Sequence, residues 1–329
     1  MKQARPPIPV TVVSGFLGAG KTTLLNRILN SDTGLRMAVM VNDFGAINID
    51  KDLIVSETQT MVSLANGCIC CTVESDLIAQ LSQLLSLKEN RPEYILIEAS
   101  GVSNPSKIAA TLRYPQFRDR LAIDSVLTVV DAEQFTSLDG DLAQLAMEQL
   151  DIADIVVLNK CDLASPEQIE MLRQRWLYPG VRLLEARFGE VPLELVLGVG
   201  HFNPARLDGS DAPAEADDPA HRCDDHCDHL DHGRQFESWS WSCDQPLSLA
   251  ALRKTLAALP ASIYRAKGFC QLAELPDQRA VLHLVGSRSE LQPGEPWGES
   301  EPATSLVLIS TRGGLDRGAL QQAFEGCIA

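Results

Sequence analysis

The sequence predicts an α/β protein, in which a first domain has a mostly parallel sheet with helices on both faces and a small α+β domain follows. Short, nearly continuous apolar runs alternate with helical patterns over residues 8–160. A glycine-rich loop joins the first of these runs to the first helical pattern. The alternation is lost over residues 203–235, and a different pattern begins at residue 236.

The strands of the first domain are predicted from the apolar runs. Strands that are buried on both faces of a parallel sheet consist of nearly continuous apolar residues. Such runs predict strands at residues 8–13, 37–41, 94–97, 125–130 and 155–158. Helical patterns predict the intervening helices at residues 21–29, 76–88, 106–112, 142–150 and 166–176.

The domain boundaries follow from the change in composition. We expect a first domain at residues 1–200, a linker at 201–235 and a second domain at 236–329. The linker is rich in Asp, Pro, Ala, Gly and His, so it is predicted to bury too little apolar area to order itself. The second domain is predicted to contain strands at 236–241, 264–272, 280–285 and 305–310, with helices at 247–259 and 316–324.

Charge and hydropathy exclude several classes of protein. The formal net charge of −16 argues against a general nucleic-acid binder, which needs a basic surface. No apolar run approaches the roughly 18 residues that cross a bilayer. The N-terminal residues lead into a strand pattern without a secretory apolar region. We therefore expect a cytoplasmic protein with no nucleic-acid or membrane partner.

A phosphate-binding loop is predicted at Gly15–Thr22, where an apolar strand is followed by a helix. Glycines allow backbone N–H groups to approach phosphate oxygens closely, and the helix N-terminus adds positive potential. Lys21 is expected to contact the β- and γ-phosphates, and the Thr22 hydroxyl to bind Mg²⁺. The residues predicted to bind nucleotide here are Gly15, Gly18, Ala19, Gly20, Lys21, Thr22 and Thr23.

A guanine-specific site is predicted at Asn159-Lys160-Cys161-Asp162, after the strand at 155–158. Asp162 can accept hydrogen bonds from the guanine N1–H and amino group, which adenine does not present, so such a site rejects adenine strongly. Asn159 is expected to hold the loop, and the Lys160 stem to cover the base. The alternative is an ordinary polar turn at the end of a strand.

Two further strand ends are candidates for contact with the γ-phosphate. Glu98 can hold Mg²⁺ through water, and the N–H group of Gly101 can contact the γ-phosphate. Asp43 lies in Asn42–Gly45, where a loop could sense the phosphate and its metal. The predicted catalytic residues are therefore Lys21, Thr22, Asp43 and Glu98. Solvated polar strand ends are the alternative for both segments.

A site for a transition metal is predicted at Cys68, Cys70 and Cys71. Thiolates are soft ligands that suit Zn²⁺ or Cu⁺, and three of them leave a fourth position open for ligand exchange. Buried or redox-active cysteines are the alternative. The linker offers weak auxiliary ligands that fit no fixed zinc framework, namely His221, Cys223, His226, Cys227, His229 and His232. A disordered acidic tract with incidental histidines is the alternative there.

The order of four motifs resembles the CobW-like family of P-loop metal-chaperone GTPases. These motifs are the phosphate loop, Gly67-Cys68-Ile69-Cys70-Cys71, Glu98–Gly101 and Asn159–Asp162. The resemblance spans nearly the whole chain and includes Tyr264-Arg265-Ala266-Lys267-Gly268 in the second domain. It implies hydrolysis of GTP to GDP with Mg²⁺, and transfer of Zn²⁺, or of Co²⁺ or Fe²⁺, to a client metalloprotein. Turnover is expected to be slow, because no arginine finger can be assigned from the sequence. Self-association of the chain that depends on metal or nucleotide is a further hypothesis.

The sequence departs from the family pattern at three positions in two motifs. The family's Asn-Glu-Phe-Gly-Glu is here Asn42-Asp43-Phe44-Gly45-Ala46, so a carboxylate is kept at Asp43 and lost at Ala46. The family's frequent Glu-Thr-Ser-Gly is here Glu98-Ala99-Ser100-Gly101. The change to alanine at position 46 removes a possible auxiliary metal ligand.

Three functions compete for this sequence. The first is a GTP-hydrolysing metallochaperone under nucleotide control. The second is a zinc-storing or zinc-sensing protein that binds GTP with negligible turnover. The third is an enzyme that transfers phosphate to a small molecule, and the guanine motif at Asn159–Asp162 argues against most kinases of this kind.

Overall fold

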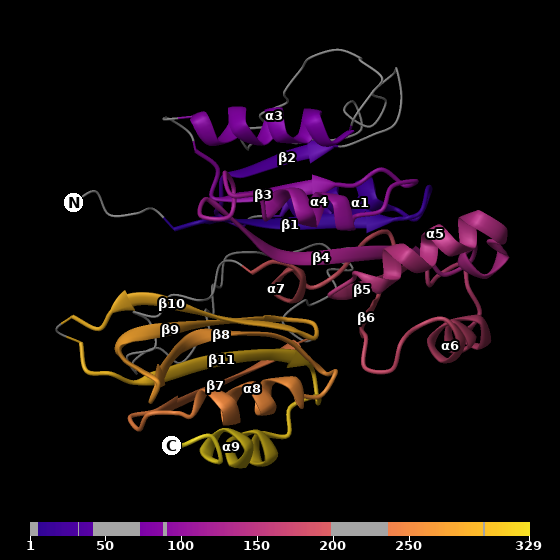
Figure 1. The fold of residues 1–329 in the computed structure, drawn as a ribbon. Coiled ribbons are helices and arrows are strands. Elements are labelled where there is room, and N and C mark those ends of the chain that lie inside the picture. Colours follow the sequence, from indigo (N-terminus) through magenta and orange to yellow (C-terminus); the bar gives the residue numbers. More distant parts are fainter. Residues whose placement is uncertain (1–5, 32, 42–72, 88–90, 199–235, 299) are drawn as a thin grey trace, which may run out of the picture. The chain divides into compact units, whose positions relative to one another are not determined.

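The computed structural model describes residues 6–31, 33–41, 73–87, 91–198, 236–298 and 300–329 (Figure 1). The chain divides into two compact units, Met1–Gly198 and Val199–Ala329, and each is described by itself. The linker that the sequence predicts at 201–235 lies outside the described residues.

The first unit contains a six-stranded sheet in the order β2-β3-β1-β4-β5-β6, and all of its described pairings are parallel. This confirms the parallel sheet that the apolar runs predict. The strands are β1 (Ile8–Gly15), β2 (Met37–Val41), β3 (Tyr94–Glu98), β4 (Leu121–Asp131), β5 (Ile155–Asn159) and β6 (Arg182–Glu185). Because the strands are parallel, their carboxyl ends meet at one edge of the sheet.

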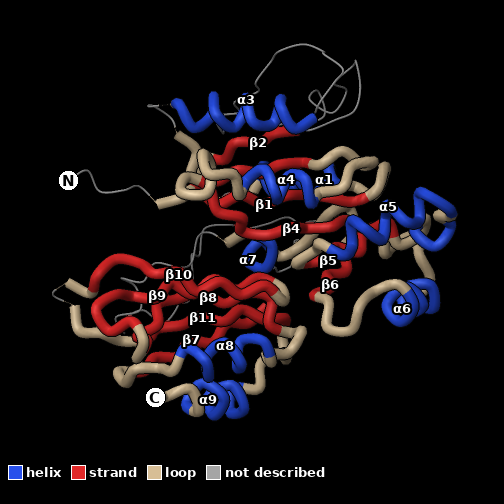
Figure 2. Tube along the Cα trace, in the orientation of Figure 1, coloured by secondary structure: helices blue, strands red, loops and turns tan. Residues whose placement is uncertain are grey.

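The connecting segments form α1 (Lys21–Asn30), α3 (Val73–Ser86), α4 (Ser106–Leu112), α5 (Gly140–Asp151), α6 (Pro166–Arg175) and α7 (Leu193–Val196), with a 3₁₀ turn, η1, at Phe135–Ser137 (Figure 2). Val10 and Val12 of β1 lie in one apolar cluster with α3 and α4. Alternate side chains of a strand point to opposite faces, so Val13 faces the other side. Helix α1 contacts β1 and β3 outside that cluster. Helices therefore cover both faces, as predicted.

A buried polar network joins the central strands. A bulge in β4 lies at Asp124, because β1 pairs with Ile123 and then with Ser125. The Tyr94 hydroxyl donates to Asp124 Oδ2 at 2.6 Å and lies 2.6 Å from Thr11 Oγ1. The Gly198 N–H donates to the same carboxylate oxygen at 2.8 Å. The network thus connects β1, β3 and β4 to the last described residue of the first unit.

The second unit is an antiparallel sheet in the order β10-β9-β8-β11-β7 with two helices on one face. Its elements are β7 (Phe236–Cys243), α8 (Leu249–Ala257), β8 (Ile263–Leu272), β9 (Leu275–Val285), β10 (Arg288–Pro296), β11 (Thr304–Thr311) and α9 (Arg317–Glu325). Leu252 and Leu256 of α8 pack with Leu320 and Phe324 of α9 against Trp241. The small α+β domain is confirmed.

Several elements differ from the sequence prediction. The edge strand β10 was not predicted, because its sequence contains Pro and Gly and little apolar alternation, which only an edge strand tolerates. β4 begins at Leu121 rather than at residue 125, because its first half contains the bulge at Asp124. Within the described ranges, no helix combines the length and apolar character needed to span a bilayer.

We predict that Tyr94→Phe lowers the free energy of unfolding by about 1–3 kcal/mol, because buried Asp124 and Thr11 each lose a hydrogen-bond partner. Urea denaturation measures this loss. Tyr178→Phe is the matched control, since Tyr178 is exposed and donates to Asp151 at 2.6 Å. Equal losses in both variants would contradict a structural role for the buried network.

Candidate functional site

A hollow of about 320 Å³ lies at the carboxyl ends of β1, β2 and β3. The phosphate loop, the first turn of α1 and the segment that follows β3 line it together. Its described lining comprises Leu17, Gly18, Gly20, Lys21, Thr22, Thr23, Val41, Glu98, Ala99, Ser100 and Gly101. The sequence predicts most of these residues to bind nucleotide.

The conformation of the phosphate loop requires glycine at two positions. Gly15 has φ of 136°, and a Cβ atom there would lie 2.1 Å from the Val129 carbonyl oxygen. Gly20 precedes α1 with φ of 101°. Buried Lys21 donates from Nζ to the Phe16 carbonyl at 3.1 Å, across the loop. The Lys21 side chain therefore spans the phosphate loop from the start of α1 back to Phe16.

Thr22 and Glu98 meet between α1 and β3. Thr22 Oγ1 donates to Glu98 Oε1 at 3.0 Å, and the Glu98 side chain is buried. A hydroxyl and a carboxylate are the hard oxygen ligands that Mg²⁺ prefers, directly or through water. The residues present therefore fit the Mg²⁺ that the sequence predicts for this place.

The segment after β3 lies directly against the phosphate loop. A Cβ atom on Gly101 would lie 2.8 Å from the Leu17 backbone nitrogen and 2.6 Å from the Leu17 side chain. Only glycine allows this approach. Gly101 is therefore part of the wall of the hollow, where we predicted a contact with the γ-phosphate.

Asn159 connects three segments that are far apart in the sequence. Its Nδ2 donates to the Ala19 carbonyl of the phosphate loop at 2.9 Å. Its Oδ1 accepts from the Gly189 N–H at 2.9 Å. The first bond joins Asn159 to the phosphate loop, and the second joins it to the turn after β6. Gly189 was not identified from the sequence, because the strand that precedes it, β6, was not predicted either.

Lys160 has a left-handed backbone, with φ of 59°, which is uncommon for a residue with a side chain. Its Nζ donates to Asp131 Oδ2 at 2.6 Å. Asp131 Oδ1 accepts from the N–H groups of Glu133 and Gln134 at 3.0 and 3.1 Å. Asp131 was also missed, and the available signal was an acidic residue at the carboxyl end of a predicted strand. Asp162 is exposed and accessible to a ligand.

Several predicted site residues lie outside the described residues: Asp43, Cys68, Cys70, Cys71, His221, Cys223, His226, Cys227, His229 and His232. In the described part of the chain, no group of three or more His, Cys, Asp or Glu side chains is placed to hold a metal ion. Burial raises the pKa of the Cys270 thiol to about 12, so this thiol is protonated at neutral pH. Cys270 also lies fully buried in the apolar cluster of the second unit, so it is a packing residue.

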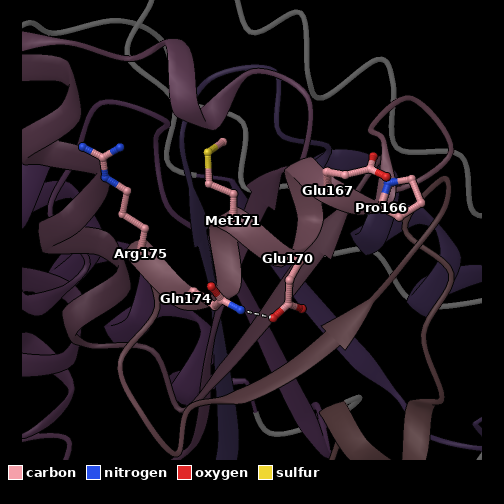
Figure 3. Close-up of a pocket in the computed structure, with 6 residues that line it drawn as sticks. All are labelled: Pro166, Glu167, Glu170, Met171, Gln174 and Arg175. Atoms are coloured by element: carbon pink, nitrogen blue, oxygen red, sulfur yellow. Dashed lines mark hydrogen bonds between the residues drawn. The ribbon is translucent and has the colours of Figure 1, made fainter.

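A separate hollow lies on the exposed surface of α6 (Figure 3). It is lined by Pro166, Glu167, Glu170, Met171, Gln174 and Arg175. Gln174 donates to Glu170 at 2.6 Å, and the other polar groups are spread along the helix. None of these side chains was predicted to bind nucleotide or metal, so we assign the candidate site to the hollow beside the phosphate loop.

Two family models match the chain. Residues 9–177 match the CobW/HypB/UreG nucleotide-binding domain, and residues 236–328 match the cobalamin synthesis protein CobW C-terminal domain. The zinc chaperone CobW of Sinorhizobium sp is 30% identical, with 98% of this chain and 97% of that protein covered. The zinc chaperone CobW of Pseudomonas aeruginosa is 33% identical, with coverages of 98% and 92%.

A further relative is longer than this chain. The zinc-regulated GTPase metalloprotein activator 1 of Dictyostelium discoideum is 32% identical, and the match covers 85% of this chain. The chain spans 66% of the length of that protein.

We predict that Gly20→Ala destabilises the nucleotide-free protein by at least about 1 kcal/mol more than Gly18→Ala, as measured by urea denaturation. Both glycines have positive φ, so both variants carry the backbone cost of about 1–2 kcal/mol. Only at Gly20 would the new Cβ lie 2.3 Å from Asn159 Nδ2, while nothing lies within 4 Å at Gly18. Equal destabilisation would show that the Asn159 contact adds no stability.

Proposed function

Because this chain belongs to the CobW/HypB/UreG family of nucleotide-binding proteins and is a GTPase, we propose that it is a metallochaperone. It binds zinc as cargo, with cobalt and iron as the other candidate ions, and transfers it to a client metalloprotein under the control of the bound nucleotide. Two relatives that match nearly the whole chain are zinc chaperones, which supports zinc as the cargo. The observation that carries the nucleotide site is the pair of hydrogen bonds in which Asn159 donates to the Ala19 carbonyl and accepts from the Gly189 N–H.

The nucleotide occupies the hollow and the adjoining loop at Asn159–Asp162. Its phosphates contact the N–H groups of the phosphate loop, and the Lys21 ammonium exchanges the Phe16 carbonyl for the β- and γ-phosphates. Asp162 accepts hydrogen bonds from guanine, while the Lys160 stem covers the base. The Asn159 bonds keep the base-binding and phosphate-binding loops at a fixed separation.

Hydrolysis relies on charge stabilisation at the terminal phosphate. Thr22 and Glu98 would hold Mg²⁺. The bound ion would neutralise the negative charge that develops on the phosphate oxygens. Lys21 supplies a second positive charge, and the Gly101 N–H contacts the γ-phosphate. No arginine lines the described part of the hollow, so we expect slow intrinsic turnover.

The cargo site is formed by Cys68, Cys70 and Cys71. These residues lie in the sequence between Asn42–Gly45 and β3, which are the two segments proposed to respond to the γ-phosphate. Thiolates persist in a reducing compartment, which supports a cytoplasmic location. The histidines and cysteines at 221–232 act as weak auxiliary ligands. Storage or sensing of zinc, with GTP as a structural ligand, is the second candidate, because slow turnover is compatible with both roles.

We predict that GTP binds much more tightly than ATP and that Asp162→Asn weakens GTP binding about tenfold or more, because the guanine N–H groups then face an amide that donates as well as accepts. Competition against a fluorescent guanine nucleotide measures both effects. Asp119→Asn is the control, since Asp119 is an exposed carboxylate outside the hollow. Equal affinity of the wild type for GTP and ATP would overturn the guanine assignment.

We predict that zinc affinity differs between the states bound to a GTP analogue and to GDP. A hundredfold difference corresponds to about 2.7 kcal/mol of coupling, within the usual range. Zinc must then change the preference for the analogue over GDP by the same factor. Replacing Cys68, Cys70 and Cys71 together by Ala should abolish this effect, whereas Cys243→Ala in the second unit should preserve it. Identical zinc affinities in both states would favour the storage or sensing function.

A further inference from the structure

Gln149 is a buried polar residue on the apolar side of α5. Two neighbours of Gln149 pack in an apolar cluster against β4 and β5: Ala146, one turn before it, and Leu150, directly after it. The Gln149 side chain is only 1% exposed. Buried amides need hydrogen-bond partners, so the partners of Gln149 indicate why an amide is present in this position.

The partners belong to the segment that follows β3. Gln149 Nε2 donates to the Gly101 carbonyl at 3.2 Å and to the Ser103 carbonyl at 3.0 Å. The Gln149 backbone carbonyl accepts from Thr128 Oγ1 at 2.8 Å, which fixes this turn of α5 on the central strand β4. One amide nitrogen therefore holds two carbonyl groups of the segment from a rigid support.

The adjacent residue of α5 contributes a third contact. Glu148 Oε2 accepts from Asn104 Nδ2 at 3.1 Å. The segment also makes an internal turn, in which the Ser103 N–H donates to the Ser100 carbonyl at 3.0 Å. Residues 100–104 are thus held by α5 on one side and by their own turn on the other.

This segment forms a wall of the hollow. Glu98, Ser100 and Gly101 all line it, and Gly101 lies against the Leu17 backbone. The position of the Gly101 peptide therefore sets the space available at the end of the phosphate loop. Any group that fixes Gly101 also fixes the contact surface for a terminal phosphate.

We propose that Gln149 is a positioning residue for the γ-phosphate: it holds Gly101 in place before the nucleotide binds, so the hollow is preorganised for GTP. This inference rests on the proposed function of the hollow. Groups that are already in place at the site of developing charge stabilise it without reorganisation. GDP lacks the terminal phosphate, so Gln149 should matter for GTP binding and hydrolysis and not for GDP binding.

Two substitutions test this role. Gln149→Met keeps the length of the side chain and removes the donor, and a neighbouring cavity of about 60 Å³ offers room for the thioether. Gln149→Glu keeps the shape but replaces the amide with a carboxylate that faces two carbonyl oxygens. Gln174→Met is the matched control, because Gln174 is an exposed glutamine of α6 that donates to Glu170 and does not line the hollow.

The experiment measures three quantities in each full-length variant: the affinity for GDP, the affinity for a non-hydrolysable GTP analogue, and the single-turnover rate of GTP hydrolysis. Both Gln149 variants should lower the hydrolysis rate and the preference for the analogue over GDP by about tenfold or more. GDP affinity should stay within about twofold of the wild type. Gln174→Met should match the wild type in all three quantities.

Two results would overturn the inference. One is wild-type hydrolysis and nucleotide preference in a folded Gln149→Met protein. The other is an equal loss of affinity for GDP and for the analogue, which indicates a purely structural role. The ratio of the two affinities tests Gln149 even when turnover is negligible. Failure of the proposed function is seen separately, as absent GTP hydrolysis in the wild type or as wild-type hydrolysis in Lys21→Ala.

Discussion

The first unit depends on one buried amide, that of Asn159. A parallel sheet brings the carboxyl ends of its strands to one edge, but it does not set the relative positions of the loops that leave them. Asn159 sets those positions by donating to Ala19 and accepting from Gly189. The loop at Asn159–Asp162, the phosphate loop and the turn after β6 therefore form one connected unit. A ligand that bridges the first two loops meets a separation that is fixed in advance.

The same device recurs around the hollow. Asp131 binds both the turn after β4 and the ammonium of Lys160. Gln149 binds two carbonyls of the segment after β3. In each case a buried polar side chain on a regular element satisfies the backbone or side chain of an adjacent loop. The loops around the hollow are thus held by side chains of β4, β5 and α5. Loops alone would lose this precision, because they lack rigid support.

The sequence predicts the parts of this architecture that depend on local pattern. The core strands consist of apolar residues because both faces are buried, so their positions and the α/β class could be predicted. The phosphate loop and Asn159–Asp162 could be predicted because each performs a defined task in a few consecutive residues. Gly189, Asp131 and Gln149 were missed, because the bonds that reveal their roles join residues 29 or more positions apart, which only the sheet order brings together. Edge strand β10 escaped prediction because its stability comes from pairing with β9 rather than from its own composition.

The bond between Gly198 and Asp124 has a mechanical consequence. Asp124 lies in β4, which has β1 on one side and β5 on the other, and it also accepts from Tyr94 of β3. Tension applied to the chain beyond Gly198 therefore acts on the middle of the sheet through this bond before it reaches the edge strand β6 through the backbone. Strands at the centre can be displaced only by shearing many backbone bonds together, whereas an edge strand can be peeled away one bond at a time. The bond between Gly198 and Asp124 thus protects edge strand β6 from being peeled away for as long as the bond holds.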